Sequence, residues 1–269
     1  MSQSTLRRPW TVHAPPEPEA QGALPDAVRV TDVTKRYAGA RSTLALDGVT
    51  LSVRPGEFVC IVGASGCGKS TLLNLVSGLD APTSGDISVQ GRAAFMFQDH
   101  ALMPWLSALD NVAMPLRLAG APKAERVERA RELLATVHLP DSADRRPHEL
   151  SGGMRQRVAL ARTLATDAQV LLMDEPFGAL DAMTRDLLHD ELESIWRTRE
   201  LTVLFVTHNV REAVRLGDRV VLLSSRPGTV IGDFPVDLPR PRRFEDPAVT
   251  HATGEVTAAL RAEVARHGA

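Results

Sequence analysis

The sequence predicts an α/β protein with a mixed β-sheet, an antiparallel β-subdomain and a helical insertion. A glycine-rich loop lies between a wholly apolar segment and a helical one. Short apolar or alternating segments, typical of strands, recur along the chain. Between about residues 99 and 164 only helical patterns occur. The 269 residues are 43% hydrophobic and 24% charged, which is the balance of an ordinary folded domain with enough apolar material for a core.

Composition excludes several classes of protein. The formal net charge of −2 gives no support for nucleic-acid binding driven by bulk charge. No apolar run approaches the ~20 residues of a membrane-spanning helix, and Arg7 and Arg8 precede no apolar segment of a signal peptide. The only cysteines, Cys60 and Cys67, have no partners at metal-binding spacing, so we expect a core residue and a small loop residue. These features favour a cytoplasmic protein.

The strand predictions follow from periodicity. Residues 1–26 contain five prolines among polar residues and predict a disordered tail. Residues 28–33 and 49–53 alternate apolar and polar side chains, which predicts half-buried antiparallel strands. Further strands are expected at 58–62, 87–90, 94–97, 169–173, 202–206, 219–223 and 228–232.

Helical patterns occur between the later strands. Residues 123–137 and 183–196 each place apolar side chains on one helical face, and another helix is expected to begin near Asp110. A basic, proline-rich link at 238–247 precedes a helix at about 247–266. We therefore expect a tail at 1–26, a folded domain at 27–240 with a helical subdomain at about 99–164, and an extension at 241–269.

Residues 63–71 read GASGCGKST and fit the pattern G-x-x-x-x-G-K-[ST] between a strand and a helix. Small residues let backbone N–H groups turn inward around an anion, and the helix start adds its unpaired N–H groups. An ordinary strand-to-helix turn has no reason to place Lys and Ser next. Lys69 is expected to reach the β- and γ-phosphates and Ser70 to ligate Mg²⁺. The expected nucleotide-binding residues here are Gly63, Ala64, Ser65, Gly66, Cys67, Gly68, Lys69, Ser70 and Thr71.

Two acids follow the apolar segment at 170–173. Ligands bind at the carboxyl ends of strands in open α/β sheets, and Asp174 there can hold Mg²⁺ directly or through water. Glu175 can orient and deprotonate an attacking water. A turn or N-cap acid is the commoner explanation of one such residue alone. The phosphate loop upstream favours the functional interpretation.

Residues 150–157 read LSGGMRQR, so Ser151, Gly152 and Gly153 open a second helix. Its N–H groups make a second anion-binding terminus, although Ser151 could equally be a plain N-cap. One triphosphate does not need two such sites far apart in sequence, unless the second serves the nucleotide of another molecule.

Together, the phosphate loop, LSGGMRQR and LLMDEPFGALD resemble the ATP-binding cassette (ABC) ATPases from about residue 28 to 240. The resemblance implies a P-loop NTPase fold of ABC type that uses ATP and Mg²⁺. Tyr37 matches the aromatic that stacks on adenine, although a half-buried aromatic at a strand end explains it almost as well. Gln98 matches the residue that senses Mg²⁺ and the attacking water, and His208 matches the histidine that contacts the γ-phosphate. Asp181 matches a loop that contacts the partner subunit.

The remaining histidines are interpreted as solvated turn residues: His13, His100, His138, His148, His189, His251 and His267. Two departures from the family pattern, Met154 and Asn209, remove no group that touches phosphate or metal. Hydrolysis is therefore expected, with Glu175, His208 and Gln98 as its catalytic residues.

The resemblance also implies partners. Two ATPase subunits pair head to tail, so that Ser151–Gly153 of one complete the site at Lys69 of the other. A homodimer on the cytoplasmic face of the membrane, integral membrane permease subunits and, indirectly, a solute-binding protein are expected, without nucleic acid. Apolar residues at 102–106 match the groove that receives a helix of the membrane subunit.

The amino-acid sequence at residues 102–112, 176–185 and 224–242 is similar to that of the ATPase subunits of importers of nitrate, aliphatic sulfonates and taurine. Alternatives are a soluble ABC ATPase of DNA repair or ribosomes, an importer for another small solute, a regulatory module without catalysis, and a separately encoded exporter subunit. Soluble ABC ATPases of DNA repair or ribosomes usually carry two cassettes, long insertions or a basic linker. The intact Asp174, Glu175 and His208 argue against a regulatory module without catalysis.

Overall fold

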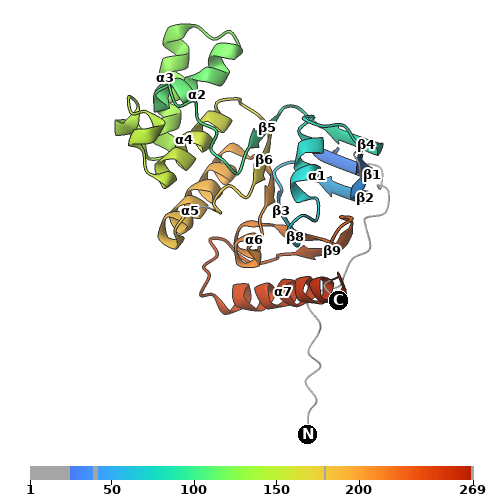
Figure 1. Ribbon diagram of the computed structural model, residues 1–269. Helices are drawn as coiled ribbons and strands as arrows, with labels where there is room; N and C mark the ends of the chain where they lie inside the picture. The colour runs from blue at the N-terminus through green and yellow to red at the C-terminus, as the bar shows by residue number, and fades with distance from the viewer. Residues whose placement is uncertain (1–24, 39–41, 179, 268–269) are drawn as a thin grey trace.

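A computed structural model describes residues 25–38, 42–178 and 180–267. The described part contains two β-sheets and a lobe of helices at one end (Figure 1). The tail predicted at 1–26 lies almost wholly outside the described residues. Within those residues, no helix is both long enough and apolar enough to span a lipid bilayer.

The larger sheet has six strands in the order β5-β6-β7-β3-β8-β9. They are β3 (Phe58–Val62), β5 (Ala93–Met96), β6 (Val170–Asp174), β7 (Thr202–Val206), β8 (Arg219–Leu223) and β9 (Val230–Pro235). Only β9 runs antiparallel to its neighbour. This confirms the predicted mixed sheet, and the parallel pairs place the ends of β3, β5, β6 and β7 at one edge.

The smaller sheet is wholly antiparallel, in the order β2-β1-β4. Its strands are β1 (Val28–Tyr37), β2 (Thr43–Val53) and β4 (Ser84–Val89). The pairing of Val28 with both Val53 and Val89 fixes the register at one end of β1. This confirms the predicted antiparallel subdomain.

Two hydrophobic cores lie on opposite faces of the six-stranded sheet, and β3 contributes to both. Phe58, Cys60 and Val62 enter the core on the side of the helical lobe. Val59 and Ile61 enter the core shared with the small sheet and with α1 (Lys69–Val76). Because successive side chains of a strand point to opposite faces, a fully apolar strand is needed here. Both cysteines are free and buried: Cys60 in the core, as predicted, and Cys67 in the phosphate loop.

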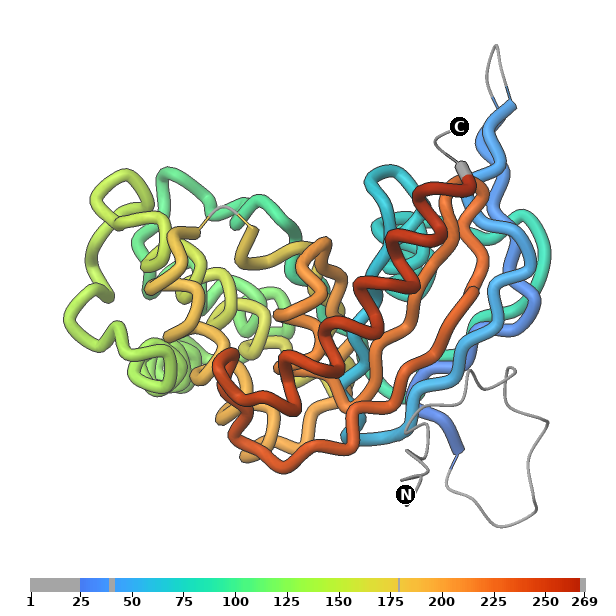
Figure 2. Tube along the Cα trace, turned by 90° about the horizontal axis from the view of Figure 1, so that it is seen from below, coloured from blue at the N-terminus to red at the C-terminus, as the bar shows by residue number. Residues whose placement is uncertain are grey.

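A helical insertion lies within about residues 99–164. It consists of α2 (Ala108–Leu118), α3 (Lys123–Thr136) and α4 (Gly152–Leu164), with short 3₁₀ turns at Pro140–Ser142 and Pro147–Glu149. Helices α5 (Ala182–Arg199) and α6 (Val210–Leu216) follow β6 and β7, in the alternation expected of parallel strands. The C-terminal helix α7 (Pro247–His267) runs beside α6 and the β8–β9 end of the sheet (Figures 1 and 2).

The strands β1, β2, β4, β5 and β6 differ from their predicted bounds at one or both ends, and the last predicted strand begins later than expected. The strand expected at 228–232 begins at Val230, because Gly228 joins β2 instead. The Gly228 N–H donates to the Ala45 carbonyl, and the Asp47 N–H donates to the Gly228 carbonyl. Gly228 therefore belongs to the loop between β8 and β9.

The interpretation of His189 as a solvated turn residue was wrong. Its side chain, on α5, is fully buried, and its two ring nitrogens form hydrogen bonds with Glu212 and Arg215. His251 is exposed but lies in a helix rather than a turn. The interpretation holds for His138, which is exposed in a turn. His13 lies outside the described residues, as does the side chain of His267.

Candidate nucleotide-binding site

A cleft of about 440 Å³ lies between the two sheets, beside the phosphate loop. It is lined by Tyr37, Thr43, Ala45, Ser65, Gly66, Gly68, Lys69, Ser70, Thr71, Gln98, Glu175 and Arg226. Apart from Thr43, Ala45 and Arg226, all of these were predicted site residues. Five segments that are distant in sequence therefore meet where the sequence placed a nucleotide.

The phosphate loop ends in a helix start that no side chain caps. Gly68 occupies the N-cap position of α1 with φ 105°, and its side-chain-free backbone leaves the first-turn N–H groups open toward the cleft. A Cβ at Gly68 would lie 2.8 Å from the Ala45 carbonyl oxygen, so only glycine fits. Uncapped N–H groups and the positive end of the helix dipole favour an anion at this position.

Lys69 is held across the loop. Its Nζ donates to the carbonyl oxygens of Gly63 and Ala64, each at 2.9 Å. The side chain is largely buried, so the ammonium group is positioned before any ligand arrives. Gly63, Ala64 and Cys67 do not line the cleft, and the first two serve instead as acceptors for Lys69.

Asp174 ends β6 and contacts Ser70, a residue of the cleft, without lining the cleft itself. Burial raises the pKa of its carboxyl group, the Glu175 charge raises it further, and a hydrogen bond from Ser70 opposes the shift. Asp174, Ser70 and Gln98 supply oxygen donors, which a hard cation such as Mg²⁺ prefers. The described residues contain no group of three His, Cys, Asp or Glu side chains that could hold a metal. The donor set therefore fits a cation that takes its remaining ligands from phosphate oxygens and water.

Glu175 and His208 come from neighbouring strands. Glu175 Oε2 lies 3.0 Å from His208 Nδ1, and the Glu175 N–H donates to the Val206 carbonyl. Glu175 adopts φ 44°, a conformation that is uncommon for a residue with a side chain. Such outliers concentrate at functional sites because the surrounding structure must enforce them.

Arg226 reaches the cleft from the loop between β8 and β9, and no motif in the sequence predicted it as a site residue. Its Nε and Nη2 donate to the Gly66 carbonyl, both at 3.3 Å. In the same loop, a Cβ on Gly228 would lie 2.2 Å from the Cys67 carbonyl oxygen. The Ser225 N–H donates to Glu263 of α7 at 2.9 Å. This loop thus packs against the outer side of the phosphate loop and ties it to the C-terminal helix.

Asp174 and His208 meet the cleft only through Ser70 and Glu175, and the remaining predicted residues do not line it either. Ser151 is the N-cap of α4 and accepts from the Met154 N–H. Asp181 is the N-cap of α5 and accepts from the Thr184 N–H. The two helix starts lie together, since a Cβ on Gly153 would be 2.5 Å from Thr184 Cγ2. The helix start at Ser151–Gly153, capped by the Ser151 side chain, is therefore separate from the phosphate loop within one chain.

Comparison with known proteins agrees with this geometry. Residues 46–178 match the model of the ABC transporter family. The chain is 46% identical over 221 residues to a nitrate import ATP-binding protein, NrtD, of Synechocystis sp., covering 79% of this chain and 83% of the relative. It is 48% identical over 213 residues to a taurine import ATP-binding protein, TauB, of Chromobacterium violaceum, covering 76% of this chain and 81% of that one.

Solved structures share the fold. The dimeric structure of MJ0796, a bacterial ABC transporter cassette, matches with a TM-score of 0.72 at 35% identity, over 79% of this chain and all of that one. This chain has the same fold as these relatives. It carries on that fold the phosphate loop, the paired acids after β6 and the helix start at Ser151. The chain therefore belongs to the ABC transporter family, as one of its ATP-hydrolysing subunits.

Proposed function

We propose that this chain is the ATPase subunit of a membrane importer for a small anion such as nitrate, taurine or an aliphatic sulfonate. The observation that carries the proposal is the cleft, where a pre-positioned lysine, Ser70 and Gln98 lie together with Glu175, whose carboxylate contacts His208. The named activities of the nitrate and taurine relatives support the choice of an importer.

ATP binding would use the residues of the cleft. The phosphates would occupy the mouth of the phosphate loop, where Lys69 and the first N–H groups of α1 supply positive charge. Tyr37 is 40% exposed at the rim, with its ring available to adenine. Its hydroxyl donates to Asp80 and Lys35 lies over the ring, so the side chain is already oriented.

Hydrolysis would be an in-line attack by water on the γ-phosphate. Glu175 would orient that water and accept its proton, and His208 would stabilise charge on the phosphate and hold the Glu175 carboxylate. Ser70, Gln98 and Asp174 would hold Mg²⁺, which supplies charge neutralisation on the phosphate oxygens when bound. Each of these side chains lies at the carboxyl end of a strand or at the start of α1, so the sheet determines their spacing.

The catalytic unit would be a head-to-tail homodimer. Ser151–Gly153 open a helix that does not line the chain's own cleft, so this terminus is available to the nucleotide of a second copy. Asp181, which lies beside it, would contact that second copy. The dimeric assembly of the related MJ0796 cassette supports this arrangement.

The membrane contact would lie near the start of the helical lobe. Phe97, Trp105 and Leu118 are exposed by 45%, 69% and 76%, although large apolar side chains are usually buried. They would receive a helix of an integral membrane permease, which places the chain at the cytoplasmic face of the membrane. An extracytoplasmic solute-binding protein would act through that permease.

Growth of a strain that carries Lys69→Ala tests the proposal. The strain is grown on taurine, alkanesulfonates, nitrate, cyanate or sulfate as single sulfur or nitrogen sources, with a wild-type copy as control. Failure on one anion with normal growth on sulfate and ammonium would support an importer and name its solute. Normal growth on every source would contradict the anion assignment and favour a process other than uptake of these solutes.

A further inference from the structure

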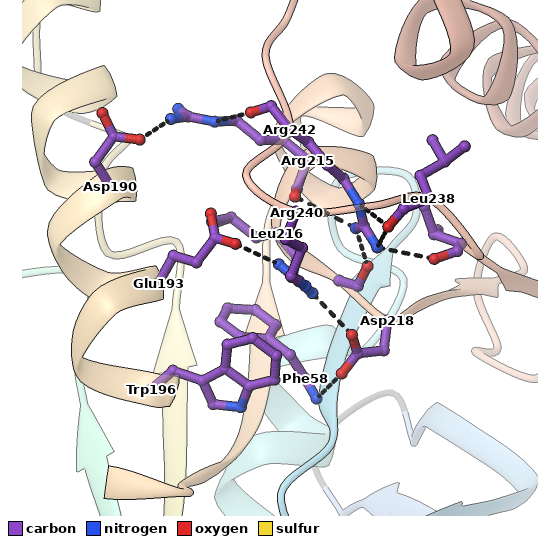
Figure 3. A network of polar contacts seen from close by, with 12 residues as sticks. Phe58, Asp190, Glu193, Trp196, Arg215, Leu216, Asp218, Leu238, Arg240 and Arg242 are labelled. Atoms are coloured by element: carbon purple, nitrogen blue, oxygen red, sulfur yellow. Dashed lines mark hydrogen bonds and ion pairs between the residues drawn. The ribbon is translucent and has the colours of Figure 1, made fainter. Parts of the chain in front are cut away.

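A second cavity, of about 760 Å³, lies between α5 and the segment that joins β9 to α7. We refer to this segment, residues 236–246, as the linker. The cavity shares no lining residue with the nucleotide cleft. Its walls include Arg197, Arg215, Arg242 and Arg243. Figure 3 shows Arg215 and Arg242 with their partners.

The linker is fixed to the domain by Arg240. Its Nη1 donates to Glu193 at 3.2 Å and its Nη2 donates to Asp218 at 2.8 Å. Its guanidinium group also lies 4.5 Å from the centre of the Trp196 ring (Figure 3). The positive charge of Arg240 is therefore neutralised by carboxylates, and the linker is held against α5.

Arg242 is different, because it is buried without a carboxylate partner in the described structure. It is 3% exposed, and its donors go to backbone carbonyls of Val214, Arg215, Gly217, Val236 and Leu238. Glu193 and Asp218 attract it only from longer range, and burial lowers its pKa to about 10. It remains a cation at neutral pH, so the wall of the cavity carries a buried and incompletely compensated positive charge.

The carboxylates that line the cavity are already paired. Asp190 accepts from Arg215 at 2.5 Å, and Glu193 accepts from Arg240. Arg197 and Arg243 are exposed, and neither guanidinium group has a protein partner among the described residues. The lining therefore presents an excess of positive charge, with two complete sets of free guanidinium donors.

We propose that this cavity is a binding site for a phosphate or sulfate group. Arg197 and Arg243 would bind the group directly, since the guanidinium fork matches oxyanion geometry. Ser194 lines the same cavity three residues before Arg197 on α5, so the two side chains are neighbours on one face of the helix. Thr198 also lines the cavity, with its hydroxyl donating to the Ser194 carbonyl. The Arg242 charge behind the linker would add long-range attraction.

Isothermal titration calorimetry of the full-length chain tests the site. Phosphate and sulfate are titrated into the Lys69→Ala protein at constant ionic strength, because that background removes the lysine of the phosphate loop. We expect one saturable site. Replacing both free arginines (Arg197→Ala with Arg243→Ala) should weaken it at least tenfold, because two charge-assisted contacts are lost. Both side chains are exposed, so the variant is expected to fold.

The matched control is Arg54→Ala with Arg131→Ala, which removes two exposed arginines that do not line the cavity. This control should bind the anions as the Lys69→Ala protein does. Equal weakening of that binding in the control would overturn the proposal. Equal affinity in the cavity variant would overturn it as well.

The same chemistry could come from a free anion or from the headgroup of a lipid. Co-sedimentation with phosphatidylglycerol vesicles, with phosphatidylcholine vesicles for comparison, separates the two sources. Vesicle binding that the cavity variant loses and the control keeps would identify a headgroup phosphate. Saturable calorimetric binding without such vesicle binding would identify a free oxyanion. The absence of both would contradict the site.

Discussion

Glu175 Oε2 and His208 Nδ1 lie 3.0 Å apart, across the ends of two parallel strands. The strands β6 and β7 pair directly from Val170–Thr202 to Asp174–Val206. Glu175 therefore lies one residue, and His208 two residues, beyond the last pair. A carboxylate held in this way has a fixed orientation toward the phosphate loop. The pair therefore depends on the register of the sheet as well as on the two residues.

Glu175→Gln is expected to bind ATP as tightly as the unmodified protein and to reduce turnover by roughly 10²–10⁴-fold, the usual contribution of a positioned base. The amide keeps the shape of the side chain but accepts no proton from water. Phosphate release measured at saturating ATP, beside an equilibrium binding titration, tests this. Undiminished turnover would remove Glu175 from the mechanism. A nucleotide-loaded Glu175→Gln protein that stayed monomeric at micromolar concentration, alone and with its permease, would contradict the head-to-tail homodimer.

Lys69→Ala is expected to weaken ATP binding itself, by roughly 10- to 100-fold, because a charge-assisted contact to phosphate is lost. The change also leaves the carbonyls of Gly63 and Ala64 without their donor. Titration with a fluorescent ATP analogue measures the loss. Lys123→Ala, in an exposed part of α3, is the control and should leave the affinity unchanged. Equal affinities of the two variants would contradict the placement of Lys69 at the phosphates.

Gly228→Ala is expected to lower ATP affinity although Gly228 does not line the cleft. A Cβ at this position would lie 2.2 Å from the Cys67 carbonyl, so the phosphate loop or its neighbour must shift. Overpacking of this kind costs about 1–3 kcal/mol of stability. Gly254→Ala in α7 meets no atom within 4 Å and should be neutral or slightly stabilising. Binding titrations and thermal melts of both variants decide the matter, and unchanged ATP affinity in Gly228→Ala would show that the contact is unimportant.

His189→Leu is expected to reduce the free energy of unfolding by about 1–3 kcal/mol, because the change removes the partner of two buried polar groups. His189 Nε2 lies 2.6 Å from Glu212 Oε1, and its Nδ1 lies 2.9 Å from Arg215. The exposed His251→Ala should stay within about 0.5 kcal/mol of the unmodified protein. Urea unfolding curves compare the two, and equal midpoints would contradict a structural role for His189.

Asp174→Asn is expected to raise the melting temperature of the nucleotide-free protein at neutral pH. Burial raises the pKa of Asp174, so the folded protein binds a proton more readily than the unfolded chain does. Its ionisation therefore costs stability above the folded-state pKa, and this cost disappears below the ordinary pKa of the group. Melts at a series of pH values should show the advantage of Asp174→Asn vanishing in acid. The variant should also lose the stabilisation that Mg²⁺ with ATP provides, and a lower melting temperature at neutral pH would contradict the expectation.

Periodicity and motif spacing predicted most of the fold, because the strands are short and strongly apolar. β3, β7 and β8 begin and end at the predicted residues. The last strand was displaced by two residues at its start, because Gly228 bonds to β2, and such pairing between distant segments leaves no local pattern.

The candidate site was predictable where a motif is continuous in sequence. Arg226 was missed because it contacts Gly66, which is 160 positions away in the sequence, and the residues that flank Arg226 form no phosphate-binding motif. His189 was misinterpreted for a related reason. A lone histidine on a helix gives no sign of burial until Glu212 and Arg215, from another helix, are placed against it.

The strand β3 contributes side chains to both hydrophobic cores, and this affects its hydrogen exchange. Its side chains anchor both cores, so its amide hydrogens should exchange with solvent only when the whole domain opens. The helical lobe contacts only one of those cores and can open by itself at lower free energy. The nucleotide would then sit on the slowest-exchanging part of the molecule, while the lobe beside it fluctuates on a faster timescale.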